Sequence, residues 1–307
     1  MSKSSMTKIV FGNTPEGEAH LFTLKNKNGV VVKVTNYGGT ITSILVPDRN
    51  GIFVDIVLGF DSLQEYMEIP NYFGCIIGRY GNRIANGKFS IDNNTFTLVQ
   101  NNKGNHLHGG TIGFNKKMWT VQESKNIDTP NITMTYISPD MEEGYPGELS
   151  LTLTYTLTDD NELIIDYQAV TDKKTICNLT NHSFFNLKGE GDGDILNHEL
   201  MIASSHITPT NETMIPTGEL LAVEGTPFDF RKSTKVGERI NEDHQQLKYG
   251  NGYDHNYVLP QGEESIKELA ASLYDPTSGR LMEVYTCLLY TSPSPRDATL
   301  SRMPSSA

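Results

Sequence analysis

The stretch Leu149-Ser-Leu-Thr-Leu-Thr-Tyr-Thr-Leu157 alternates apolar and hydroxyl side chains without a break. Successive side chains of a β-strand point to opposite faces, so the leucines and Tyr155 share one face and the serine and threonines share the other. This pattern is typical of a half-buried antiparallel strand. Asp159-Asp160-Asn161 then predicts a turn, and the run Leu163–Ala169 predicts the second strand of a hairpin.

The rest of the chain repeats this pattern and contains few helical segments. Further strands are predicted at Val30–Tyr37, Ile41–Val46, Val54–Leu58, Thr95–Leu98, Trp119–Ser124, Ile132–Ser138, Ile176–Thr180, His198–Ala203, Leu269–Tyr274 and Leu281–Thr286. Short helices are predicted at Ser62–Ile69, where Ser62 and Glu65 have capping-box spacing, and at Thr234–His244. Because strands follow strands without long helices between them, the sequence predicts an all-β protein, a large sandwich or a barrel.

Composition excludes several classes of function. The 307 residues include 25 Lys+Arg and 37 Asp+Glu, a formal net charge of −12. Nucleic acid and anionic membrane surfaces require a basic face, so we expect neither as a partner. No apolar run approaches the roughly 20 residues of a membrane-spanning helix. Neutral polar substrates such as sugars remain compatible with this charge.

The cysteines and the N-terminus indicate the compartment. Cys75, Cys177 and Cys287 are odd in number, far apart and outside any CxxC motif, which favours small buried thiols in a reducing environment. Met1–Phe11 lacks the apolar segment of a secretory signal. We therefore expect a cytoplasmic protein.

The last stretch of the chain differs from everything before it. In Tyr290–Ala307, eight of 18 residues are Ser or Pro, and three prolines exclude a central strand. We expect one β-domain over residues 1–286, incomplete at its C-terminus, and a tail over residues 287–307 that is disordered or foreign to the gene.

Five polar clusters lie among the predicted strands. They are Gly78–Gly87, Asn105–Gly110, Asn178–Leu187, Thr226–Arg231 and Asn251–Tyr257. They combine Arg, Asn, Asp and His, which hydrogen-bond sugar hydroxyls, with aromatic rings that can cover the C–H face of a pyranose. Histidine titrates near neutral pH and can serve as an acid or a base.

Each cluster also has a simpler interpretation. His106 and His108 would face the same side of an extended chain and could ligate a metal, but the spacing places no third ligand. A lone histidine such as His182 is usually structural. Gly109-Gly110 could approach a phosphate, but the chain has neither a GxGxxG motif nor a P-loop.

Taken together, the motifs resemble the aldose 1-epimerase family from about Val10 to Thr286. The matching segments are Asn36–Gly39, Asp55–Phe60, Tyr72–Gly74, Gly78-Arg79, Asn82–Ala85, His108–Gly110, Thr180–Leu187, Gly252–His255 and Arg280–Val284. Each segment is weak evidence alone, but their order and spacing are specific.

The resemblance implies a fold, a reaction and a set of site residues. The fold would be a large antiparallel β-sandwich with a sugar site in an open cleft, and the reaction would interconvert α and β anomers of aldohexoses such as galactose and glucose, without cofactor or metal. A base would take the proton of O1–H while an acid protonates the ring oxygen O5, so that the ring opens. The resemblance assigns the acid to His182, and substrate binding to Asn82, Arg83, His108, His182, Ser183, Phe184 and Asp254.

One departure affects the expected activity. The family's base is a glutamate on a strand beyond Arg280–Val284, so Glu283 does not correspond to it, and Asp297 is the only later acid. We therefore expect the base to be absent and this chain to lack turnover. The alternative is a non-catalytic sugar-binding member of the fold. A sugar-6-phosphate epimerase would need extra cations at the pocket rim. We expect a monomer or weak dimer.

Overall fold

The computed structural model describes residues 3–122, 129–260 and 268–286. The expected tail at 287–307 lies outside the described residues, as do residues 123 and 124 at the end of one predicted strand.

The first half of the sandwich is a five-stranded antiparallel sheet. Its strands are β1 (Ser5–Thr14), β2 (Gly17–Lys25), β3 (Val31–Thr35), β4 (Thr40–Pro47) and β5 (Phe53–Asp55), paired in chain order. β1 and β2 were not predicted. β1 is exposed along most of its length and shows no buried period-two face, whereas β2 is buried in its second half.

The second half is a four-stranded antiparallel sheet. It consists of β11 (Thr120–Gln122), β12 (Asn131–Ser138), β13 (Leu149–Leu157) and β14 (Leu163–Thr171), again in chain order. β13 has the predicted bounds, and its leucines and Tyr155 are buried. The predicted hairpin is confirmed, with Leu157 opposite Leu163.

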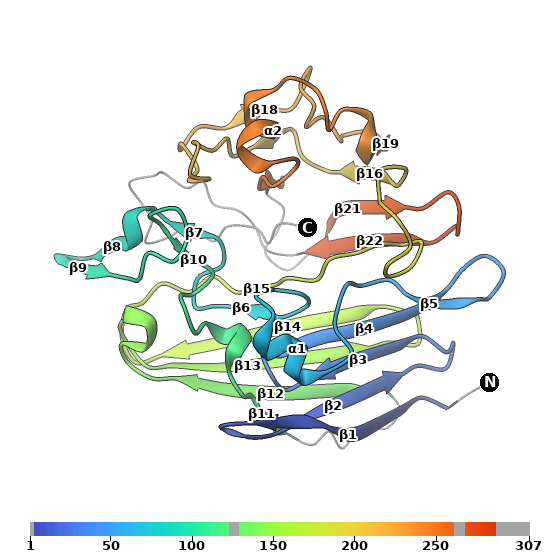
Figure 1. Cartoon of the computed structure of the whole chain (residues 1–307), viewed down its shortest axis with the longest axis horizontal. Helices are drawn as coiled ribbons and strands as arrows, with labels where there is room; N and C mark the ends of the chain where they lie inside the picture. The colour runs from blue at the N-terminus through green and yellow to red at the C-terminus, as the bar shows by residue number, and fades with distance from the viewer. Residues whose placement is uncertain (1–2, 123–128, 261–267, 287–307) are drawn as a thin grey trace.

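The core lies between these two sheets. It joins Val32, Val34, Ile41 and Ile44 of the first sheet to Leu149, Leu151, Leu153 and Tyr155 of the second. The hydroxyl of Tyr155 donates a hydrogen bond of 2.7 Å to the carbonyl oxygen of Gly39. Burying each such aliphatic side chain contributes about 1.5–3 kcal/mol. Figure 1 shows both sheets together in the lower part of the molecule. The predicted antiparallel β-sandwich is confirmed.

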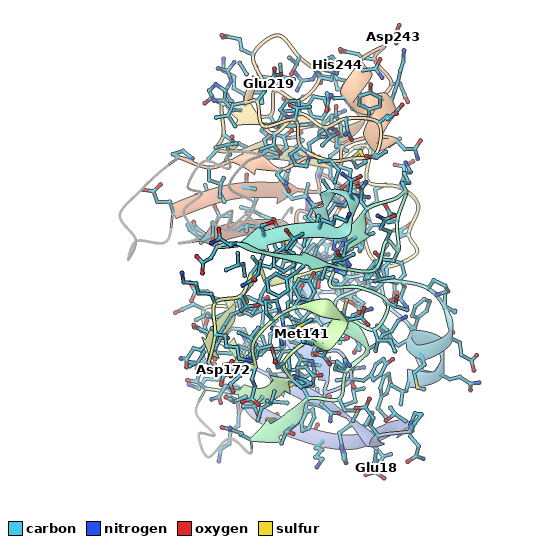
Figure 2. The ribbon with its side chains drawn as sticks, turned by 90° about the vertical axis from the view of Figure 1, so that its left-hand side faces the viewer. Glu18, Met141, Asp172, Glu219, Asp243 and His244 are labelled. Carbon is cyan, nitrogen blue, oxygen red and sulfur yellow. The ribbon has the colours of Figure 1, made fainter. Side chains whose placement is uncertain are left out.

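Most of the other regular elements lie above the sandwich or to one side of it, and α1 is drawn in front of it (Figure 1). They are β8 (Lys88–Ile91), β9 (Asn94–Thr97), β16 (Glu199–Ile202), β17 (His206–Ile207), β18 (Leu221–Ala222), β19 (Thr234–Lys235), β20 (Tyr257–Val258), β21 (Glu268–Tyr274), β22 (Leu281–Thr286), α1 (Leu63–Glu68), α2 (Gln245–Gly250) and the 3₁₀ turns η1 (Ala85–Gly87), η2 (Phe114–Lys116), η3 (Glu142–Gly144) and η4 (Val236–Glu238). In Figure 2, Glu18 at the start of the β2 hairpin and His244 beside α2 lie at opposite ends of the molecule.

Two short ladders occupy the middle of the fold. β6 (Ile76–Ile77) pairs with β15 (Thr180–Asn181), and β7 (Arg83–Ile84) pairs with β10 (His106–Leu107), both antiparallel. In Figure 1, β6 and β15 lie between the sandwich and the upper strands. These ladders bring together segments about 100 and 20 residues apart in sequence.

The first predicted helix is confirmed and the second is wrong. Ser62 and Glu65 form the capping box of α1. The predicted helix Thr234–His244 is instead β19, η4 and a loop ending at His244, the N-cap of α2. The reason is backbone pairing: Val236 donates its N–H to His198 and Gly237 donates its N–H to Leu196, so the chain bonds to a neighbour rather than to itself.

The predicted strand Ile176–Thr180 is also largely wrong. Only Thr180 belongs to a strand, β15. The backbone N–H of Asn178 donates to the carbonyl oxygen of Arg79, and its carbonyl oxygen accepts from the N–H of Gly81. These two bonds form an isolated parallel bridge between Asn178 and Tyr80 rather than a ladder.

No helix within the described ranges is long and apolar enough to cross a membrane.

Gly74 lies two residues before β6 and tests how the ladder of β6 and β15, the central ladder, is packed on the first sheet. Its φ is +65°, and a Cβ there would lie 1.9 Å from the carbonyl oxygen of Ile41. Gly51 has φ +79° with open space around it. Gly51→Ala therefore measures the cost of the left-handed backbone without a steric clash, about 1–2 kcal/mol. We expect Gly74→Ala to lower the free energy of unfolding by clearly more than Gly51→Ala in urea denaturation. Equal losses in the two variants would contradict this packing.

Candidate active site

His182 is held by an extension of the central ladder. Its backbone N–H donates to the carbonyl oxygen of Cys75 at 2.9 Å, and its carbonyl accepts from the N–H of Gly74 at 3.0 Å. The pairing of β15 with β6 therefore continues past Asn181, and His182 cannot shift along the chain without breaking it.

The side chain of Asn181 fixes the direction in which the chain leaves His182. Its Oδ1 accepts from the N–H of Ser183 at 3.1 Å, and its Nδ2 donates to the carbonyl oxygen of Gly74 at 2.9 Å. Asn181 thus supplies both a local turn and a cross-strand bond. The Oγ of Ser183 is buried and has no hydrogen-bond partner among the described residues.

The second ladder places Asn82, Arg83 and His108. Arg83 lies opposite Leu107, and beyond that pair the N–H of His108 donates to the carbonyl oxygen of Asn82 at 3.0 Å. The N–H of Asn82 donates to Nδ1 of His108, also at 3.0 Å. The Nε of Arg83 donates to Oδ1 of Asn102 at 3.2 Å, which orients the guanidinium.

The bond between Asn82 and His108 determines the tautomer of His108. A peptide N–H always donates, so Nδ1 must present its lone pair and the ring hydrogen of neutral His108 must reside on Nε2. His108 is therefore a fixed hydrogen-bond donor toward any ligand that reaches Nε2.

The two ladders bring the rings of the predicted site into contact. The ring centroids of His108 and His182 are 5.1 Å apart and nearly perpendicular, and those of His182 and Phe184 are 5.0 Å apart. Phe184 is 42% exposed, so one face of this cluster is open to solvent.

Asp254 lies close enough to this cluster to act on the charges of Arg83 and His182. It lies between α2 and β20, where its buried neighbour His255 is anchored to Oε1 of Gln246 at 2.9 Å. The negative charge of Asp254 raises the pKa of both Arg83 and His182, against the larger lowering caused by burial. The structure thus brings Asn82, Arg83, His108, His182, Phe184 and Asp254 together.

Burial controls the protonation of both histidines. It lowers the pKa of His108 to about 3, with the nearby His182, Arg83 and His106 adding to the effect. Burial also lowers the pKa of His182, but a hydrogen bond to its own backbone carbonyl and the charge of Asp254 oppose the shift. At neutral pH, His108 is an uncharged donor. Of the two imidazoles, His182 is the one whose protonated form is stabilised by neighbouring groups.

His106 does not share the environment of His108. Its Nδ1 lies 2.8 Å from the carbonyl oxygen of Val99 and its Nε2 lies 2.7 Å from the hydroxyl of Tyr145, so both ring nitrogens are occupied. The premise of an extended chain at this pair is wrong, because His108 has φ +52°. His106 is a satisfied core histidine.

Other polar residues of the sequence clusters have structural roles. Arg79 is buried and donates to backbone oxygens of Ser138 and Pro146, both at 3.0 Å. Arg231 forms an ion pair of 2.7 Å with Asp229 on the surface. Glu283 is exposed on β22, where its carboxylate accepts from the hydroxyl of Tyr285 at 3.4 Å.

Sequence reasoning missed three residues of the site. Asn102 orients Arg83, Asn181 orients the chain around His182, and Tyr72 contacts both site histidines. Tyr72 and Asn181 lie within segments that matched the family pattern, so a signal was present. Asn102 lies in none of the matched segments, and it is 19 residues from the guanidinium that it orients.

The charge of Asp254 provides a test by titration. Removing it withdraws a nearby anion that stabilises the imidazolium, so Asp254→Asn should lower the pKa of His182 further. NMR titration of the ring would measure the shift, and Asp166→Asn, on the exposed face of β14, is the control. An unchanged or raised pKa of His182 in Asp254→Asn would contradict the geometry.

Comparison with known proteins identifies the family of this chain. The chain matches the family model described as aldose 1-epimerase over residues 20–304. Galactose mutarotase of Sus scrofa is 43% identical over 284 residues, which cover 92% of this chain and 79% of that protein. Aldose 1-epimerase of Escherichia coli strain K12 is 37% identical over 273 residues, 89% of this chain and 77% of that protein.

A solved structure agrees with this result. The crystal structure of galactose 1-epimerase from Lactobacillus acidophilus NCFM superposes with a TM-score of 0.79 at 30% identity, covering 89% of this chain and 77% of that one. Since the family model, the relatives and the fold coincide, this chain belongs to the aldose 1-epimerase family and is an isomerase of that class.

Proposed function

We propose that this epimerase interconverts the α and β anomers of aldohexoses such as galactose and glucose at the cluster of His108, His182, Arg83 and Asp254. The observation that carries the proposal is that the two histidines differ in how their ring nitrogens are engaged. His108 is locked as a donor by the N–H of Asn82, whereas His182 is free to exchange a proton beside Asp254.

The substrate class rests on the chemistry of the lining and on the relatives. Asn82, Arg83 and Asp254 offer donors and acceptors suited to neutral hydroxyl groups. The exposed ring of Phe184 offers an apolar surface for the C–H face of a pyranose. The relatives named galactose mutarotase and galactose 1-epimerase support galactose as a substrate.

The reaction requires proton transfers at two oxygens. His182, as its imidazolium, donates a proton to O5 while the C1–O5 bond breaks and the proton of O1–H passes to a base. The resulting aldehyde rotates about C1–C2, and the same transfers in reverse close the ring as the other anomer. The donor Nε2–H of His108 holds a sugar oxygen during these steps. We assign the base to no described residue.

A second candidate function is sugar binding without turnover. It is favoured because no carboxylate among the described residues is assigned as the base: Glu283, which the family pattern also excludes, lies on the exposed face of β22 and accepts from the hydroxyl of Tyr285. In this case the site would bind the same sugars and leave the anomers at their spontaneous rate of exchange.

Location, assembly and domain extent are part of the proposal. Cys75 and Cys177 form no disulfide with a described residue and the formal net charge is −12, which supports a cytoplasmic protein without nucleic acid or membrane partners. We propose a monomer or weak dimer whose β-domain spans residues 1–286, with 287–307 as a separate tail.

His182→Asn tests the proton-transfer role. The variant keeps a polar side chain but cannot donate a proton, and loss of a positioned acid typically costs about 10²–10⁴-fold in rate. In a version of the protein that carries the family's base, we expect kcat for the mutarotation of fresh α-galactose, followed by polarimetry, to fall by that factor. His20→Asn, at a histidine that pairs with Glu18 on β2, should keep the wild-type rate.

Two outcomes would contradict the proposed role. Near-wild-type turnover in His182→Asn would show that another group supplies the proton. Galactose binding by the wild-type chain with exchange at the spontaneous rate would support the second candidate function instead.

A further inference from the structure

Tyr72 is the aromatic residue that touches both site histidines. Its ring centroid is 4.7 Å from that of His108, edge to face, and 5.6 Å from that of His182. Since the two imidazoles are themselves 5.1 Å apart, the three rings form a closed cluster. Neither the sequence clusters nor the proposed mechanism assigns a role to Tyr72.

The backbone around Tyr72 is fixed by the same segment that holds His182. The carbonyl oxygen of Tyr72 accepts from the N–H of Cys75 at 3.5 Å and from its thiol at 3.2 Å. The next residues, Gly74 and Cys75, form the backbone bonds to His182. A short, tightly bonded turn therefore connects the ring of Tyr72 to the position of His182.

A second link runs from Tyr72 to Arg83. Burial raises the pKa of the Tyr72 hydroxyl, whereas Arg83 lowers it, so the phenol is neutral at neutral pH and lies near the guanidinium. Its hydroxyl makes no hydrogen bond to a described residue, in contrast to the buried tyrosines Tyr145 and Tyr155. The ring is thus the part of Tyr72 that contacts its neighbours.

We propose that Tyr72 is a positioning residue of the epimerase, whose ring holds His108 and His182 in their crossed arrangement and excludes water from both imidazoles. The proposal rests on the proposed function of His182. The ring of Tyr72 packs edge to face against His108 and tilted against His182, and these contacts restrict the rotation of both imidazoles.

The consequence for proton transfer follows from desolvation. Burial is the largest influence on the pKa of each histidine. The ring of Tyr72 packs against both imidazoles and therefore covers part of their surface. The charged or titratable groups that act on the two imidazoles or on Tyr72 are Asp254, Arg83, His106 and Cys75, from four different segments, and none is altered by changing Tyr72. Removing the ring should therefore admit water and raise the pKa of His182 toward 6.5.

The experiment compares Tyr72→Leu with Tyr72→Phe. Tyr72→Leu should raise the pKa of both imidazoles in NMR titration, shift the pH–rate profile in the same direction and lower kcat by up to about 10²-fold through misplacement. Tyr72→Phe keeps the ring and should restore the wild-type titration. Phe96→Leu, which loses a ring stacked at 5.2 Å on Phe89 away from the site, is the matched control for stability.

The outcomes separate this inference from the proposed function. Unchanged titration of His108 and His182 in folded Tyr72→Leu would overturn the role of the ring, whether or not the enzyme turns over. A shifted titration in both Tyr72→Leu and Tyr72→Phe would assign the effect to the hydroxyl and also overturn it. A wild-type chain without His182-dependent turnover would count against the proposed function, while the titration would still decide the role of Tyr72.

Discussion

The site depends on the backbone pairing of residues 74–77 with residues 180–182. This ladder connects segments about 100 residues apart, and its last bonds are those of His182 with Gly74 and Cys75. Gly74 also accepts from the N–H of Ile41 and the side chain of Asn181, so one residue joins the first sheet of the sandwich to the histidine. A rigid core thus sets the position of a titrating ring through main-chain bonds.

The second constraint is the use of one peptide N–H to distinguish two similar histidines. Both imidazoles are partly buried and lie 5.1 Å apart, and burial lowers the pKa of each. The N–H of Asn82 distinguishes them further, because it reserves Nδ1 of His108 as an acceptor. Asn82 and His108 both adopt positive φ, at 70° and 52°, a conformation that costs about 1–3 kcal/mol per residue and is retained here to form this bond.

The success of sequence-based prediction followed the strength of the local pattern. The alternation of Leu149–Leu157 yields a strand with the same bounds, and Ser62 with Glu65 yields the capped helix, because both signals lie within ten residues. The helix predicted at Thr234–His244 failed because Val236 and Gly237 bond to Leu196 and His198. Asn82, Arg83, His108, His182 and Asp254 were found through resemblance, since their convergence depends on ladders that no local pattern reveals.

The roles of Tyr72, Asn102 and Asn181 explain why such a site is built on short ladders. Anomer interconversion moves protons only, so the groups involved need accurate orientation more than strong charge. Two-residue ladders end quickly, and the chain leaves each one through a turn that aims a side chain inward. The side chain of Asn181 accepts from the backbone N–H of Ser183, that of Asn102 accepts from the guanidinium of Arg83, and the ring of Tyr72 packs against both imidazoles. Longer strands would continue the alternation and turn every second residue away from the substrate.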